Sequence, residues 1–236
     1  MTDISNSRFR LLSTLQPLAA VALFALAAQA GWAQEVFGRG PAPTLTRAAA
    51  GTSAPDDDGF IRRWLVLEPI SVDGQLGDSA VQSTVKSDRF PGQLSVIPED
   101  GDTVEVRGNE LTWYAVDTSL YNLNLFHFSY ALGRPTSNVL FWIVTVIDSP
   151  REIENARLAI GSNAASIWWV NGEEVIGIYN DRQTVIDDGV SRRITLKDGR
   201  NVIRGAIVNA GGATDFCARF LDSEYEPITD IVVQLD

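Results

Sequence analysis

The sequence predicts an all-β protein folded as an antiparallel β-sandwich or barrel. Short runs rich in Val, Ile, Trp, Phe and Tyr follow one another closely, and many alternate between apolar and polar residues. Turn-forming residues separate these runs. Long stretches of helical periodicity are almost absent, which argues against a βαβ architecture. We expect strands at residues 60–70, 110–117, 122–132, 138–148, 156–160, 166–171, 174–179, 192–196, 201–209, 213–221 and 230–235.

One short helix is expected after the first strand, over residues 76–86, followed by a long loop rich in proline and glycine. Residues 138–148 are apolar on both faces, which predicts a central strand with its second face also covered. Alternation in the next aromatic run should turn Ile167 and Trp169 toward the core and Trp168 the other way.

Two dipeptides, Asn171-Gly172 and Asp198-Gly199, predict tight hairpins between neighbouring strands. Both are favoured in type I′ turns, because Asn, Asp and Gly tolerate the positive φ that the two central residues must adopt.

The first 33 residues have the pattern of a secretory signal peptide. Arg8 and Arg10 form a short positive region, and residues 18–28 are an unbroken apolar run that is too short for a comfortable membrane span. Small residues fit cleavage after Ala33, with a second possible site a few residues earlier. Pro17 argues against the alternative, an uncleaved membrane anchor. We therefore expect a secreted or periplasmic product.

Three segments are expected: a signal peptide over 1–33, a flexible linker over 34–58 and one β-sandwich domain over 59–236. The linker is rich in Ala, Pro, Thr and Gly and lacks apolar periodicity.

A net charge of −11 makes nucleic acid and anionic membranes poor partners. The single cysteine, Cys217, cannot form an internal disulfide, so we expect a buried thiol and a fold held by packing.

Four segments, in this order, resemble the galactose-binding-like jelly roll, an accessory module of secreted glycoside hydrolases and carbohydrate esterases. The segments are FIRRWLVLEPI (60–70), SNVLFWIVTVIDSP (137–150), ARLAIGSNAASIWWVNGEEV (156–175) and ITLKDGRNVIRGAIVNAGGATDFCARFLD (194–222). The chain departs from this family at Ser162-Asn163, where relatives carry two aspartates, and at Glu68, where Gly is more usual.

The resemblance implies an exported, non-catalytic module that binds carbohydrate, such as a polysaccharide or glycan. A second hypothesis is a structural or assembly protein of the cell envelope that binds an extracytoplasmic protein partner. A third, less supported, is a carbohydrate esterase.

Motifs for catalysis are weak. No Gly-x-Ser-x-Gly elbow occurs. Residues 77–80 (GDSA) are faintly similar to the start of a GDSL-type esterase, whose serine needs a histidine to accept its proton. The only histidine, His127, lies in an expected strand and has the pattern of a structural residue. We therefore expect Ser79 to have no catalytic partner and the chain to have no catalytic residues.

The acidic residues do not form a convincing catalytic pair, because adjacent acids at turns are usually solvated charge. These pairs are Glu173-Glu174, Asp187-Asp188 and Glu224/Glu226. A zinc site is excluded by the count of one Cys and one His. Calcium, which binds oxygen ligands, stays open at Asp181, Asp187 and Asp188. No other cofactor is expected.

The predicted binding surface is the loop YNDRQTVIDDG, which follows the Asn-Gly hairpin. Sugar sites combine an aromatic platform with polar side chains that bind hydroxyl groups. The loop supplies both in five consecutive residues: Tyr179, Asn180, Asp181, Arg182 and Gln183. An ordinary solvated loop is the alternative interpretation. A second aromatic group, Trp113, Tyr114 and Tyr121, is more typical of packing.

Overall fold

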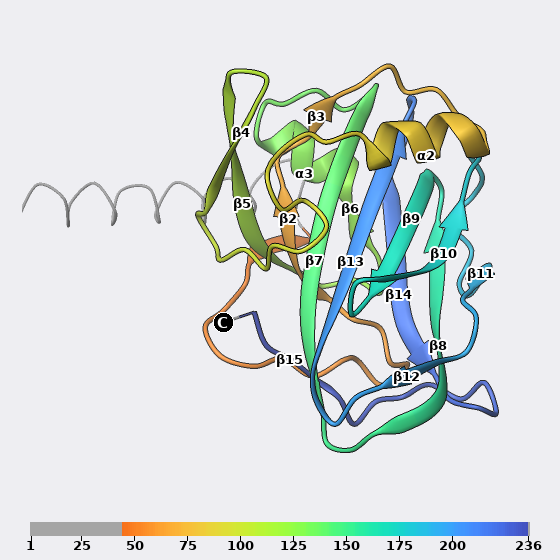
Figure 1. Ribbon diagram of the computed structural model, residues 1–236. Coiled ribbons are helices and arrows are strands. Elements are labelled where there is room, and N and C mark those ends of the chain that lie inside the picture. Colours follow the sequence, from red (N-terminus) through yellow and green to blue (C-terminus); the bar gives the residue numbers. More distant parts are fainter. Residues whose placement is uncertain (1–43, 236) are drawn as a thin grey trace, which may run out of the picture.

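Two antiparallel sheets pack face to face in the computed structural model, which describes residues 44–235 (Figure 1). This arrangement confirms the predicted β-sandwich. The larger sheet consists of β1 (Leu45–Arg47), β2 (Arg63–Leu67), β3 (Ile70–Ser71), β4 (Thr103–Val106), β5 (Asn109–Thr118), β7 (Val139–Ser149), β9 (Ala165–Val170), β10 (Glu173–Ile178), β13 (Gly199–Asn209) and β15 (Val232–Val233). The smaller sheet consists of β6 (Leu123–Asn124), β8 (Ile153–Ser162), β11 (Gly189–Val190), β12 (Ile194–Leu196) and β14 (Asp215–Leu221).

The order of strands brings distant segments together. The main path of the large sheet is β1-β5-β2-β7-β13-β9-β10, and that of the small sheet is β11-β8-β14-β6 with β12 also on β8. The expected helix is present as α2 (Asp78–Lys86), which packs against β9 and β13. Among residues 44–235, no helix is long and apolar enough to cross a membrane.

A second helix, α3 (Leu125–Ala131), corrects the prediction of one helix and of a strand over 122–132. Asn124 caps this helix, because its side-chain oxygen accepts a hydrogen bond from the backbone N–H of His127 at 2.7 Å. The buried residues Leu125 and Phe128 are three positions apart, so one face of the helix points into the core. His127 is therefore a helical residue rather than a strand residue.

The main core lies between the two sheets and is centred on aromatic rings. Trp64 and Trp168 from the large sheet meet Phe216 from the small sheet, with ring centroids 5.2 Å apart for Trp64–Phe216 and 5.3 Å for Trp168–Phe216. Trp168 thus faces the core between the sheets, and the predicted orientation of this strand was wrong.

The outer face of the large sheet has a core of its own. Trp142 and Trp169 stack there with centroids 5.8 Å apart, and Val81 and Val85 of α2 cover them from outside together with the loop that follows. Residues of β7 alternate between the two cores, which confirms that this strand is central and covered on both faces.

The first described residues belong to the sandwich, which corrects the predicted linker over part of its length. Strand β1 pairs with β5, and Leu45 is fully buried in the core between the sheets. Arg63 holds the same segment, because it donates to both carboxylate oxygens of Asp117 at 2.8 Å and to the carbonyl of Gly51. The rest of the predicted linker, 34–43, and the predicted signal peptide lie outside the described residues.

Of the two predicted hairpin turns, the one at Asn171-Gly172 is present and the one at Asp198-Gly199 is not. Asn171 and Gly172 both adopt positive φ, 52° and 83°, so the type I′ turn between β9 and β10 is confirmed. At the second dipeptide only Gly199 has positive φ. The flanking strands do not pair there, because β12 lies on β8 of the small sheet and β13 lies in the large sheet. This turn therefore carries the chain from one sheet to the other.

Candidate functional site

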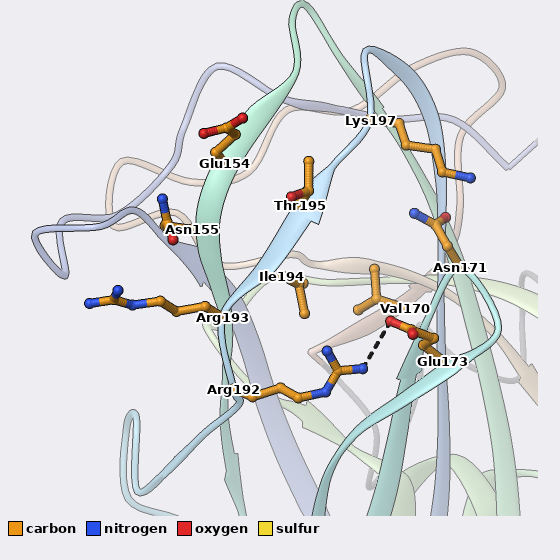
Figure 2. A pocket seen from close by; sticks show the side chains of 10 residues that line it. All are labelled: Glu154, Asn155, Val170, Asn171, Glu173, Arg192, Arg193, Ile194, Thr195 and Lys197. Carbon is orange, nitrogen blue, oxygen red and sulfur yellow. Dashed lines mark hydrogen bonds and ion pairs between the residues drawn. The ribbon is translucent and has the colours of Figure 1, made fainter.

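A groove of about 520 Å³ opens between the edges of the two sheets (Figure 2). The turn between β9 and β10 forms one wall, and strands β8 and β12 form the other. Val170 and Ile194 are buried and form its apolar floor. The other lining residues are all polar: Glu154, Asn155, Asn171, Glu173, Arg192, Arg193, Thr195 and Lys197.

The groove combines fixed and available hydrogen-bonding groups. Arg192 donates to Glu173 at 2.9 Å across the groove, as the dashed line in Figure 2 marks. Asn171 is held rigidly, because its amide donates to Asn201 at 2.8 Å and accepts from the backbone N–H of Val202 at 3.0 Å. Three basic side chains against two acidic ones give this groove a positive balance within a chain of net charge −11.

Arg193 and Lys197 form no ion pair with any residue of the described part, 44–235, and both are exposed. Their charged groups are therefore accessible to a ligand. A register shift in the pairing of β12 with β8, between Ile194 and Leu196, lies opposite Asn155, which has a φ of 59°. Such an irregularity re-aims side chains at the edge of a sheet, and it brings Glu154 and Asn155 to the groove together.

The loop predicted as the binding surface lies at the other end of β10. Tyr179 is six positions after Glu173 of the groove, a distance of about 20 Å along an extended strand. Tyr179 is half-buried, packs against the outer core and accepts a hydrogen bond from Gln82 at 3.0 Å. Its ring therefore serves packing between β10 and α2 and is not an open platform.

The remaining predicted residues of that loop point into solvent. Asn180, Asp181 and Gln183 are exposed, and Arg182 pairs with Asp188. The structure brings the five residues together along the chain, as their sequence requires, but it does not arrange them around the groove.

Two of the three carboxylates considered for calcium form ion pairs, and the third, Asp181, is exposed. Asp187 pairs with Arg219, and Asp188 pairs with Arg182. Within residues 44–235, no group of three His, Cys, Asp or Glu residues is placed to hold a metal ion. The dipeptide Ser162-Asn163 has a structural role, because Asn163 accepts from the backbone N–H of Asp215 at 3.0 Å.

Ser79 and His127 lie on helices that cover opposite faces of the large sheet. Helix α2 covers the outer core, whereas α3 inserts its apolar residues between the sheets. The two residues therefore cannot form a nucleophile and base pair. Glu173 and Glu174 each pair with a basic residue, Arg192 and Lys86, as is usual for solvated acids.

The second aromatic group is dispersed. Trp113 is buried in the outer core, and Tyr114 contacts Phe128 of the core between the sheets. Tyr121 is exposed and packs on Phe60 with centroids 5.5 Å apart. These three residues do not form a platform.

Cys217 is buried on the outward side of the small sheet, under the loop that contains Val185. A Cβ added at the neighbouring Gly161 would lie 2.4 Å from the Val185 carbonyl oxygen and 2.8 Å from Cys217 Sγ, so the loop and the thiol are closely packed. Burial raises the pKa of the Cys217 thiol from 9.0 to about 11.

We expect the native thiol to react with a disulfide reagent at pH 8 at least about 100-fold more slowly than the unfolded chain, because a pKa raised by two units lowers the thiolate fraction by that factor. The raised pKa also means that this group stabilises the fold below pH 9 and loses its contribution as the pH rises toward 11. Spectrophotometric measurement of the labelling rate of Cys217 in native and urea-unfolded protein tests the expected difference in rate. Equal rates would show that the loop does not cover the thiol.

The groove was not predicted from the sequence, because its walls come from segments that are distant in the chain: 154–155, 170–173 and 192–197. One signal was present: basic residues concentrate in 192–200, at Arg192, Arg193, Lys197 and Arg200, although the chain as a whole is acidic.

No family model matches the chain, and no curated protein matches it. Solved structures with a distant likeness include a PA14 sugar-binding domain from an RTX adhesin, with 11% identity, a TM-score of 0.42, and coverage of 72% of this chain and 96% of that one. The PA14 domain of the antifreeze protein MpAFP has 16% identity, a TM-score of 0.38, and coverage of 77% and 97%. A family 35 carbohydrate-binding module from Clostridium thermocellum has 12% identity, a TM-score of 0.27, and coverage of 73% and 99%. The likeness is not specific to the galactose-binding-like family, and at these scores it defines neither a family nor a ligand.

Proposed function

We propose that this protein is a non-catalytic module that binds a saccharide, a polysaccharide or glycan, in the groove between β8, β12 and the β9–β10 turn. The observation that carries the proposal is the composition of the groove. Carboxylate, amide, hydroxyl, guanidinium and ammonium groups surround two buried apolar side chains in a volume of about 520 Å³. Ligand sites typically combine an apolar floor with a few polar groups that orient the ligand.

A saccharide fits this composition better than the other ligand classes. Each sugar hydroxyl both donates and accepts hydrogen bonds, and the groove offers donors in Arg192 and Lys197 beside an acceptor in Glu154. A lipid would need a larger apolar surface, and nucleic acid would need a basic face that a chain of net charge −11 does not supply elsewhere.

The compartment belongs to the same proposal. The N-terminal pattern predicts export, and a secreted or periplasmic module would meet glycans of a cell surface or matrix.

The second candidate, binding of an extracytoplasmic protein, is favoured by one observation: Val185 and Ile186 are exposed side by side in the loop after Tyr179. Two exposed apolar residues are a small patch, so we place this candidate second.

Affinity electrophoresis in native gels containing soluble β-glucan, xylan, galactan or polygalacturonate tests the proposal. We expect at least one polysaccharide to retard the wild-type protein and Arg192→Ala to weaken that binding about tenfold, because a hydrogen bond from a charged group contributes about 1.5–3 kcal/mol. Arg182→Ala is the matched control, since Arg182 is also in a surface ion pair but lies in the loop distant from the groove.

Each result has one interpretation. Retardation by none of the four polysaccharides would contradict the proposed function. Loss of binding in Arg182→Ala but not in Arg192→Ala would move the site to the loop that the sequence predicted. A strong decrease of binding with added salt would identify an acidic saccharide, and insensitivity to salt a neutral one.

A further inference from the structure

Tyr225 is an exposed aromatic residue held in a conformation that tyrosine rarely adopts. Its φ is 71° and its side chain is 57% exposed. The turn around it is well ordered by hydrogen bonds, because Asp222 accepts from the backbone N–H groups of Glu224 and Glu226 at 2.8 and 3.0 Å. A glycine would adopt this φ without strain, whereas a side chain costs about 1–2 kcal/mol. This cost indicates that the side chain of Tyr225 has a role that glycine could not fulfil.

The guanidinium group of a buried arginine, Arg157, stacks on one face of the Tyr225 ring. The guanidinium carbon of Arg157 lies 4.3 Å from the ring centroid, and Arg157 itself is only 8% exposed. One face of the ring is thus covered by a cation in a favourable stacked arrangement. Because the residue is still more than half exposed, its other face is open to solvent.

The turn that carries Tyr225 follows a strand that pairs with β8, and β8 forms one wall of the groove. Arg157 follows Asn155 on strand β8 by two residues, and Asn155 lines the groove. Two residues of extended chain span at most about 7 Å. Strand β14 ends beside the same part of β8, where Leu221 pairs with Arg157, and the turn with Tyr225 follows directly (Figure 1). The groove has no aromatic side chain among its own lining residues.

We infer that Tyr225 is the aromatic platform of the saccharide site, on which a second sugar ring stacks beside the one held in the groove. This inference rests on the proposed function. Aromatic faces pack against the apolar C–H faces of pyranose rings, while the neighbouring polar side chains bind the hydroxyl groups. A site with two adjacent parts takes an oligosaccharide or polysaccharide in preference to a monosaccharide.

The same native gels test the platform with four variants. We expect Tyr225→Ala to weaken binding of the retarding polysaccharide about tenfold and Tyr225→Phe to bind like the wild type, because phenylalanine keeps the ring. Tyr225→Gly should bind as weakly as Tyr225→Ala without backbone strain, so a loss of folding in the alanine variant does not decide the outcome. Tyr130→Ala is the matched control, because Tyr130 is 58% exposed on α3.

The outcomes separate this inference from the proposed function. If Tyr225→Ala and Tyr225→Gly bind like the wild type while Arg192→Ala binds weakly, the platform is refuted and the groove stands. If the tyrosine variants bind weakly and Arg192→Ala binds normally, Tyr225 contacts the saccharide, but the groove assignment and the two-part site both fail. If no polysaccharide retards the wild type, both fail. A ring that only shields Arg157 would change the midpoint of urea unfolding and leave binding unchanged.

Discussion

Replacing Trp168 by alanine should lower the free energy of unfolding by about 3–5 kcal/mol, the range for a large aromatic residue removed from a packed core. Trp168 is fully buried and contacts Trp64 and Phe216, so its removal opens a cavity where the two sheets meet. Urea unfolding followed by circular dichroism measures the change. Tyr130→Ala, at an exposed aromatic residue, should change the stability by less than about 0.5 kcal/mol.

Gly205 provides a second measurement of the same contact. It lies opposite Trp168 on β13, and a Cβ added there would be 2.8 Å from the indole ring and 2.9 Å from Ile143. Gly205→Ala should therefore cost about 1–3 kcal/mol through overpacking. In the Trp168→Ala background the same change should cost less, because the indole is gone. Equal costs in both backgrounds would show that glycine is not required there to make room for Trp168.

The elements predicted best were those whose pattern has a single structural solution. Residues 138–148 are apolar on both faces, which a central, doubly covered strand alone accommodates, and β7 has this place. The Asn171-Gly172 turn was predictable because the type I′ geometry demands residues that tolerate positive φ.

Predictions failed where local sequence fits two solutions equally well. Both faces of β9 are buried, so alternation shows that Trp168 and Trp169 diverge but not which one meets the other sheet. The run at 122–132 has apolar residues at both strand and helix spacing. The side chain of Asn124 decides in favour of the helix by capping it.

The site was harder to predict than the fold. The polar loop at 179–183 has the composition of a sugar site within five adjacent residues, whereas the groove is assembled from β8, the β9–β10 turn and β12. Only the long-range pairing of β12 with β8 brings Arg193 close to Asn155. The density of basic residues in 192–200 was a usable signal, but nothing in the sequence alone indicates which acidic and amide residues face them.

Leu45→Ala should lower the free energy of unfolding by about 2–3 kcal/mol, near the lower end of the range for buried leucine. Leu45 is fully buried between the sheets although it belongs to a strand of three residues at the edge of the fold. The segment is also fixed by the backbone, since Ser119 donates to the Thr44 carbonyl at 2.9 Å and Ala48 donates to the Ala115 carbonyl at 2.9 Å. Unfolding in urea, measured as for Trp168, gives the change.

Thr46→Ala is the matched control, because Thr46 lies on the same strand and points into solvent. Its effect should stay within about 0.5 kcal/mol. The comparison separates two views of residues 44–58, since a flexible linker would make both variants neutral, whereas a docked strand makes only Leu45→Ala costly. A docked strand also means that the folded domain includes residues 45–47 and does not begin at residue 59.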